Sequence, residues 1–346
     1  MRYRVMLLAA AIVGTLLTAG CYEVNDSSRE QAICFRAGSP LLNDADTKTA
    51  DPKTAFTSGD AFYVIGAKTV SGQLQAVFGA VNAPQLVSFN GTNWTYSPTK
   101  SWDTQASSYG FLAIARPSDA TGTIYCDPSS FPFAASVAYD PTVRQYDLMV
   151  ACDERTDPQQ FKSEIPVHLQ FYHTLSAVSV VVYNDSPIQD IVLNSYGFRN
   201  LYTTATLTVE HFEETPVSSW MVTRFDNSTV LGQETNHTIA GGGTNHYPTT
   251  LAYDLMIPQD LDPVNPANRP KLVLDYSYND GQNHRVETSI NLRDIVMRGS
   301  DQPITSWQQG VKYNYEIHIR YGGGIRVHVV TTPWEEVNAE TPGLLI

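Results

Sequence analysis

The first residue with clear chemical potential is Cys21, whose thiol comes directly after the small pair Ala19-Gly20. An almost unbroken apolar run from Val5 to Ala19 precedes it, with Arg2 and Arg4 at its head. A membrane-spanning helix needs ~20 apolar residues to cross ~30 Å of hydrocarbon, so this run is short for a membrane-spanning helix. A basic head followed by a short apolar block is typical of a secretory signal peptide that is removed.

The residues around Cys21 resemble a bacterial lipobox, in which the cysteine is acylated and becomes the first residue of the mature chain. A lipobox usually has an aliphatic residue three positions before the cysteine, where this chain has Thr18. We predict a signal peptide over residues 1–20 and a polar, lipidated tether over residues 21–31. Acyl chains such as palmitate hold a protein at a membrane, since each buried CH₂ contributes ~0.8 kcal/mol. The alternative is an ordinary signal peptide followed by an incidental cysteine.

The eight histidines do not predict a metal site. None of them belongs to an H-E-x-x-H motif. His237 and His246 flank the loop TIAGGGTN and could approach each other around a metal ion, but solvated loop histidines are the commoner outcome. His173 lies in an apolar strand pattern and is expected in the core or in a turn. His318 and His328 are expected to face one another across a glycine hairpin, with no chemistry required.

Motifs for covalent or phosphoryl chemistry are missing from the sequence. There is no G-x-S-x-G elbow, and Gly241-Gly242-Gly243 lacks the lysine and the helix of a nucleotide-binding loop. Carboxylates cluster at Glu213-Glu214 and Glu335-Glu336, and a glycosidase needs two carboxyl groups ~5 to 9.5 Å apart. In a chain with 35 acidic residues such clusters are expected by chance. We predict no catalytic residue, no cofactor and no enzyme.

Three further cysteines, Cys34, Cys126 and Cys152, are not spaced as zinc ligands. In an exported protein Cys126 and Cys152 could form a disulfide, although buried free thiols are an equally good interpretation. The cysteines after Cys21 therefore indicate no function.

Composition and charge describe a folded, acidic protein. Hydrophobic residues make up 42% of the chain and charged residues 16%, a composition typical of a protein that folds around hydrophobic cores. Loss of residues 1–20 leaves 346 − 20 = 326 residues, enough for two domains, and changes the net charge from −13 to −13 − 2 = −15. Neither nucleic acid nor anionic lipid head groups would attract such a surface.

Short strands account for nearly all of the sequence, and no stretch shows a long apolar period of 3.6 residues. Turn signals such as Asn90-Gly91 and Asp280-Gly281 separate the strands. Many short strands with turns between them predict a mostly β protein made of β-sandwiches. The clearest strands are expected at Phe62–Val64, Gln85–Phe89, Phe111–Ile114, Val167–Phe171, Val178–Val182, Leu272–Tyr278 and Tyr313–Ile319.

Two hairpins can be predicted together with their turns. The segment KLVLDYSYNDGQNHRVETSINL turns at Asp280-Gly281, where glycine supplies the positive φ of a tight turn. The segment YNYEIHIRYGGGIRVHVVTTPW turns at its three glycines, which sets Tyr315, Ile317 and Ile319 against Ile325, Val327 and Val329. A domain boundary is expected in the polar stretch 153–164.

Several segments, in order, resemble the fimbrillin family of Bacteroidetes, which comprises lipoprotein-precursor pilins and fimbrial accessory proteins. The segment VHLQFYHTLSAVSVVVYN (167–184) resembles the family's strand with His-Ala-Leu-Ser, although Thr174 replaces the usual alanine. Each motif is weak alone, but their order over most of the chain makes the likeness moderately specific. The other segments that carry it are TAFTSGDAFYVIG (54–66), YGFLAIARP (109–117), YDLMVA (146–151), and YNYEIHI with PWEEV (333–337).

This resemblance implies two transthyretin-like Greek-key β-sandwich domains in tandem, over residues 32–160 and 161–337, followed by a tail over 338–346. It implies an outer-membrane lipoprotein at the cell surface that serves a fimbrium as stalk, tip or anchor. Subunits of that family lose an N-terminal strand to an arginine-specific protease, and a neighbour's strand fills the groove by β-augmentation. The expected partners are other pilus subunits, the outer membrane and a surface receptor or glycan.

The processing bond that the resemblance suggests is Arg36-Ala37, within the stretch QAICFRAG, and Arg29 lies just before it. The plainer interpretation of Arg36 is a solvent-facing residue on an edge strand. The tail ends in Pro-Gly-Leu-Leu-Ile, which could be a donor strand or could dock on its own domain.

A surface glycan-binding lipoprotein is the alternative function. The chain has 19 Tyr and 5 Trp, which could stack on sugars, and Trp94, Tyr96 and Trp102 cluster near Asn90-Gly91. Aromatic side chains more commonly fill β-sandwich cores.

Overall fold

A computed structural model describes residues 32–38, 56–186, 189–211, 216–228, 230–241, 249–251 and 253–334. The expected signal peptide, the tether with Cys21 and the tail 338–346 lie outside these residues. Nearly all regular structure in the described part is β-strand, which confirms the prediction of a mostly β protein. The tandem arrangement and the domain limits stay a prediction. Short 3-10 turns occur at Pro158–Gln160, Pro266–Asn268, Leu292–Asp294 and Tyr321–Gly323.

The predicted strands coincide or overlap with observed ones, because each is rich in β-branched or aromatic residues. Gln85–Phe89 is found with the predicted ends, and the longest strands extend the prediction by several residues. The strands are β2 (Ala61–Val70), β4 (Gln85–Phe89), β6 (Ala106–Ala115), β10 (Val167–Gln170), β12 (Ser176–Asn184), β20 (Lys271–Asn279) and β24 (Val311–Ile319).

A seven-stranded sheet dominates the first half of the chain, with the order β11-β9-β6-β2-β4-β5 and β3 paired to β2. Its central strand β6 is buried continuously from Tyr109 to Ala115, because the sheet is covered on both faces. Phe111 and Ala113 face one core while Leu112 and Ile114 face another. The strands not yet given are β3 (Gln73–Phe78), β5 (Trp94–Thr95), β9 (Met149–Arg155) and β11 (Tyr172–His173).

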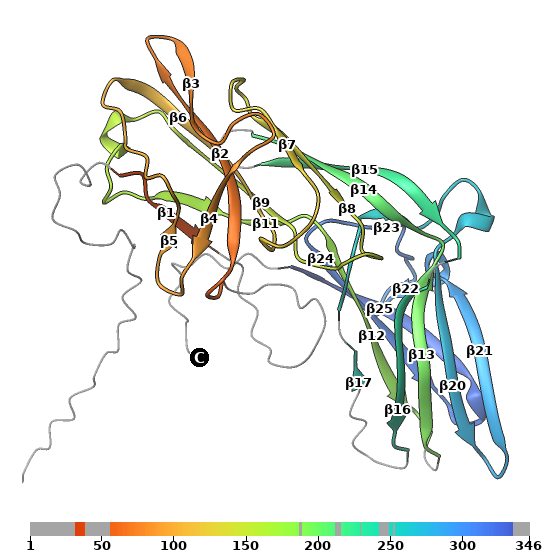
Figure 1. Cartoon of the computed structure of the whole chain (residues 1–346). Coiled ribbons are helices and arrows are strands. Elements are labelled where there is room, and N and C mark those ends of the chain that lie inside the picture. Colours follow the sequence, from red (N-terminus) through yellow and green to blue (C-terminus); the bar gives the residue numbers. More distant parts are fainter. Residues whose placement is uncertain are drawn as a thin grey trace, which may run out of the picture.

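The core on one face of this sheet, here called the aromatic core, contains Phe62, Phe78, Phe111 and Phe171. The core on the other face, here called the middle core, is closed by a four-stranded sheet in the order β15-β14-β8-β7. The strands of that sheet are β7 (Ile124–Cys126), β8 (Ala134–Tyr139), β14 (Leu201–Glu210) and β15 (Val217–Asp226). Strands far apart in sequence thus lie side by side, as Figure 1 shows.

The remaining strands enclose a third core between two sheets, of which the first is six-stranded, β17-β12-β24-β25-β22 with β18 paired to β12. The second is four-stranded, β16-β13-β20-β21. A further pair joins β19 (Gln259–Asp260) to β23 (Ser306–Trp307). The other strands are β13 (Ile191–Arg199), β16 (Leu231–Ile239), β17 (Thr249–Thr250), β18 (Asp254–Met256), β21 (Asn283–Asn291), β22 (Val296–Met297) and β25 (Ile325–Pro333).

Both predicted hairpins are confirmed. Gly281 has φ +110° in the turn between β20 and β21. In the second hairpin Ile317 pairs with Val327, as predicted. The expectation that His318 and His328 face one another is wrong: the turn is centred on Gly322, so each histidine is opposite a charged residue of the other strand and the two are diagonal neighbours.

Residues 173–176, here called the junction segment, connect several elements through their polar groups. Nδ1 of His173 lies 3.0 Å from the carboxylate of Asp147, and the Thr174 hydroxyl donates to the carbonyl of Leu148 (2.7 Å). Trp220 of β15 donates its indole N–H to the carbonyl of Thr174 (2.7 Å). His173 is buried, as expected for a core residue. The N–H of Gly310 donates to the carbonyl of Leu175 (2.9 Å). The junction segment therefore ties together the residues just before β9, the residues just before β24, and β15.

A buried carboxyl group lies where the first half of the chain meets β18. Asp254 is 6% exposed, and Gln145 donates its side-chain N–H to one carboxylate oxygen (3.1 Å). Among the described residues the other oxygen has no hydrogen-bond partner. Burial raises the pKa of Asp254 to about 6, and the hydrogen bond from Gln145 only partly opposes this. The ionised form is therefore less stable in the folded protein than in water.

We expect Asp254→Asn to stabilise the protein at pH 7.5. The folded pKa of about 6 lies above the ~3.9 of an exposed aspartate, so the stability linked to protonation is present below pH ~4 and is lost as pH rises through about 6. The free energy of unfolding should rise by about 1–3 kcal/mol at pH 7.5 and change little at pH 4. Denaturant unfolding at both pH values measures this.

Asp301→Asn, at an exposed position, is the matched control and should change stability by less than about 0.5 kcal/mol. An equal effect of Asp254→Asn at both pH values would contradict the prediction.

Candidate functional site at the N-terminal strand

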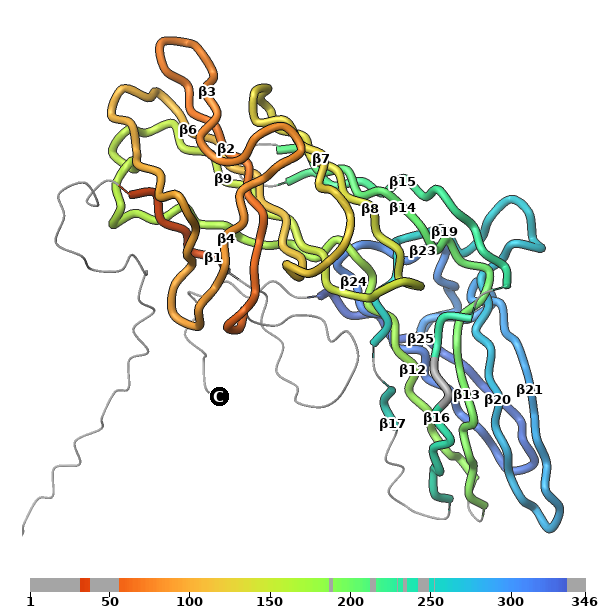
Figure 2. Tube along the Cα trace, viewed as in Figure 1, coloured from red at the N-terminus to blue at the C-terminus, as the bar shows by residue number. Residues whose placement is uncertain are grey.

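The first described strand, β1 (Phe35–Gly38), is the element on which the predicted processing site lies. It pairs in parallel with β10, in the register Phe35 to Val167 and Arg36 to His168. Figure 2 shows β1 in dark red among the strands of the first half. Just before β1, the N–H of Ile33 donates to the carbonyl of Lys100 (2.8 Å). The segment is thus held at both ends by backbone hydrogen bonds.

The side chains of Ile33 and Phe35 fill a groove in the aromatic core. Ile33 is 1% exposed and Phe35 is 3% exposed. The Phe35 ring makes edge contacts with four aromatic rings, at centroid distances of 5.3 to 6.1 Å. Those rings belong to Phe62, Phe78, Tyr96 and Phe111. Burying each such side chain contributes about 1.5–3 kcal/mol, so β1 is an integral part of this core.

One polar group, the hydroxyl of Tyr96, contacts the backbone of the residues that fill the groove. The Tyr96 hydroxyl donates to the carbonyl of Ile33 (2.6 Å), and burial raises the pKa of Tyr96 to about 12. This hydroxyl is therefore neutral at physiological pH, and it recognises the backbone of the segment and not its side chains. Any strand that lies here with an apolar residue in place of Ile33 would present the same carbonyl.

Arg36 and Ala37 are both half-buried, in contrast to Phe35. Their peptide bond lies inside the strand that pairs with β10. Because proteases cleave extended chain that is free of its own sheet, access to this bond requires β1 to separate from β10. The structure therefore places the predicted processing residues in a covered strand, next to the residue that anchors it.

The other residues singled out from the sequence that fall within the described ranges are not brought together into a site. Cys126 and Cys152 are both buried, and the possible disulfide between them is not formed. His237 is exposed on β16, whereas His246 lies outside the described residues. Within the described ranges no group of three or more His, Cys, Asp or Glu could hold a metal ion. Glu213, Glu214, Glu335 and Glu336 also lie outside those ranges.

The aromatic residues proposed to bind sugars are taken up by the aromatic core. Trp102 is 3% exposed and stacks on Phe161 at 5.5 Å, and Tyr96 is bound to the β1 segment. Trp94 is half-buried and contacts Phe56, Phe62 and Phe89. A sugar platform needs an exposed ring face, which these contacts remove from Trp102 and Tyr96.

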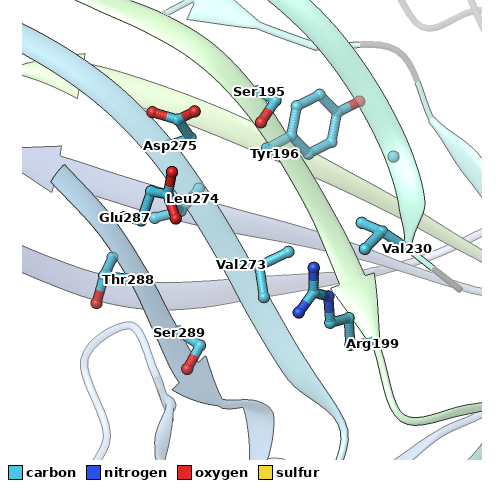
Figure 3. Close-up of a pocket in the computed structure, with 11 residues that line it drawn as sticks. Ser195, Tyr196, Arg199, Val230, Val273, Leu274, Asp275, Glu287, Thr288 and Ser289 are labelled. Atoms are coloured by element: carbon cyan, nitrogen blue, oxygen red, sulfur yellow. The ribbon is translucent and has the colours of Figure 1, made fainter. Parts of the chain in front are cut away.

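A depression of about 550 Å³ lies over β13, β20 and β21. Figure 3 shows Arg199 at one end and Asp275 with Glu287 at the other. Asp275 accepts hydrogen bonds from Arg285 (3.0 Å) and Asn194 (2.8 Å), and Arg285 holds the pKa of Asp275 below its usual range. A carboxylate kept ionised in this way cannot serve as a general acid.

No helix in the described part of the chain is long and apolar enough to span a membrane.

Comparisons with known proteins were made for both sequence and fold. A family model described as fimbrillin-like matches residues 47–334. No curated protein matches the chain. Among solved structures, a fimbrial protein from Bacteroides vulgatus is 13% identical, covers 88% of this chain and 100% of its own, and has a TM-score of 0.57. At that identity the likeness shows a shared fold.

Two other solved structures are similar over most of their length. A candidate cell adhesion protein from Bacteroides uniformis is 15% identical over 90% of this chain and 100% of its own, with a TM-score of 0.49. The tip fimbrial protein Mfa3 from Porphyromonas gingivalis is 13% identical over 80% of this chain and 95% of its own, with a TM-score of 0.39.

We expect Phe35→Ala to destabilise the protein by about 3–5 kcal/mol, because it leaves a cavity between four aromatic rings. Arg36→Ala, at the neighbouring half-buried position, is the control and should cost no more than about 1 kcal/mol. Equilibrium unfolding in guanidinium chloride measures both. Equal effects of the two substitutions would show that β1 is not anchored through Phe35.

Proposed function

The chain belongs to the fimbrillin-like family, and we propose that it is a structural or adhesive pilus component, exported as a surface lipoprotein and assembled by strand exchange. Its role is structural or adhesive and not catalytic. Its partners are other pilus subunits, together with a receptor or glycan on the surface to which it adheres. The observation that carries the proposal is the β1 segment, a short strand that fills an aromatic groove through Ile33 and Phe35.

Three properties of β1 suit it for replacement by another strand. Among the described residues β1 itself pairs with β10 alone, and the residues just before it add the Ala32–Ser101 bridge and the bond from Ile33 to Lys100, so few backbone bonds must break before it leaves. Its affinity comes from two alternate apolar side chains and from backbone contacts, which is how β-augmentation works. While it is in place it covers apolar surface that would otherwise promote aggregation. Cleavage after Arg36 would release the residues that fill the groove.

The two ends of the chain complete the proposal. Acylation of Cys21 would tether the protein to the outer membrane, with residues 21–31 as a flexible spacer. The tail 338–346, with its apolar Leu-Leu-Ile end, is a candidate donor strand for the groove of a neighbouring subunit. Whether the protein serves as stalk, tip or anchor would follow from whether its own β1 is released.

We expect Arg36→Ala to abolish release of the N-terminal segment. N-terminal peptide mapping of the protein from sheared surface filaments should find a start at Ala37 in the parent and none in the variant. Arg36→Lys should also stay uncut if the protease requires arginine, although it preserves the charge. Arg29→Ala is the control and should be processed like the parent. A start at Ala37 that persists in Arg36→Ala filaments would disprove processing at this bond.

We expect Cys21→Ser to lose its acyl chains and to leave the membrane fraction, since no other part of the proposal supplies a membrane anchor. Metabolic labelling with palmitate and intact mass would detect the change. Cys126→Ala, which removes a buried thiol, should retain the label. Palmitate labelling that survives in Cys21→Ser would remove the lipoprotein assignment.

A further inference from the structure

The sheet β15-β14-β8-β7 has few charges on its outer face, although the chain has a net charge of −13. Its inward residues, such as Leu207 and Val137, fill the middle core. Its outward residues form cross-strand rows that end on β15 at Ser219 and Met221. Those rows are Tyr125, Ser136, Thr208 and Ser219, and Ala138, Thr206 and Met221. A third row sets Glu210 opposite Val217, so the two rows through Ser219 and Met221 are uncharged and one acidic residue borders them.

β15 is also an exposed edge of that sheet. In the described part of the chain it pairs only with β14, and Figure 1 shows it at the outer edge. Met221 is 63% exposed and Val217 is 53% exposed, both on the outer face. No charged residue lies between Val217 and Thr223. Natural edge strands are usually protected by charges, proline or bulges. On this edge Pro216, the bulge near Thr223 and Arg224 lie at the two ends, and residues 217–222 between them are unprotected and available for pairing.

A second long edge in the same molecule shows the usual protection. β21, at the end of its own sheet, carries His284, Arg285 and Glu287. Its side chains would bring charges into any strand that approached. The contrast shows that the bare edge of β15 is a local property and does not reflect the composition of the whole protein.

We propose that β15 pairs in antiparallel orientation with β15 of a second copy of the chain, around a two-fold axis at Ser219. In that register Val217 of each copy lies opposite Met221 of the other, so the two most exposed apolar side chains of the strand cover each other twice. Residues that face each other across an antiparallel pair share one face of the sheet, and Val217, Ser219 and Met221 all point outward. The pair would join two four-stranded sheets into one of eight strands.

Charge favours a second copy over a charged partner at this edge. Each copy is acidic overall, yet the paired segment contributes no charge, so like charges stay apart. The regular part of β15 ends at a bulge near Thr223, which limits the pairing to about residues 217–222. Such an interface is smaller than ~1,200 Å², so the dimer is weak and transient. Screening of the net charge by salt should strengthen it.

The test is a disulfide cross-link at the proposed axis. In Ser219→Cys the two cysteines face each other, so mild oxidation of membranes that carry the full chain should give a covalent dimer. Tyr125→Cys, exposed on the far strand of the same sheet, is the matched control and should give none beyond the parent. The dimer yield with Ser219→Cys should rise with salt concentration.

A second substitution tests the apolar contact itself. Met221→Lys in the Ser219→Cys background should reduce the cross-link about tenfold or more, because a lysine is then set against Val217 in both halves. Glu287→Lys, on the other edge, adds positive charge as well and should leave the cross-link unchanged. Equal cross-linking of the two cysteine variants, no cross-link in a folded Ser219→Cys protein, or no effect of Met221→Lys would overturn the proposal. None of these outcomes depends on processing at Arg36.

Discussion

The middle core is completed only when β14, with β15 on its other side, pairs with β8, and this non-local pairing is the constraint on which the rest of the structure depends. Strands from before residue 140 and after residue 200 form one sheet, and the junction segment locks it to β9 through Asp147, Leu148 and Trp220. To assemble a sheet from distant parts of the chain, a long loop must first close, and this costs conformational entropy. The contacts that offset this cost form only afterwards, so we expect such a sheet to become stable late in folding. Once formed, this sheet and the seven-stranded sheet are held together without ladder bonds to β1.

The strand that we propose is exchanged is β1, and its contacts are divided in a way that suits this role. The seven-stranded sheet is complete without it, because β6 and its neighbours bond to each other. β1 instead adds side chains to a core whose other walls are already fixed. A strand that contributes apolar contacts but few ladder bonds can be exchanged for another with the same alternation. A central strand such as β6 could not leave without unfolding the sheet.

Local patterns predicted most of the strands and both hairpins, because alternation and turn glycines act over a few residues. The register around Gly281 and the pairing of Ile317 with Val327 follow from the turn alone. The opposition of His318 and His328 was wrong by two residues, because the register that pairs Ile317 with Val327 sets His318 opposite Arg326. The link from β8 to β14 has no local signal. Neither does the parallel pairing of β1 with β10, so the sequence could suggest Arg36 but not its covered position.

The edges of the molecule differ in a way that a pilus component can use. β1 covers one apolar groove, β21 is protected by charge, and β15 is unprotected. A soluble monomer gains nothing from an uncharged edge with exposed methionine and valine, which is a hazard for aggregation. In a protein held at high local density on a surface or along a filament, the same edge can make weak contacts that single molecules in dilute solution would not populate. The bare edge then complements strand exchange: the groove would connect subunits end to end, while the edge would connect them side by side.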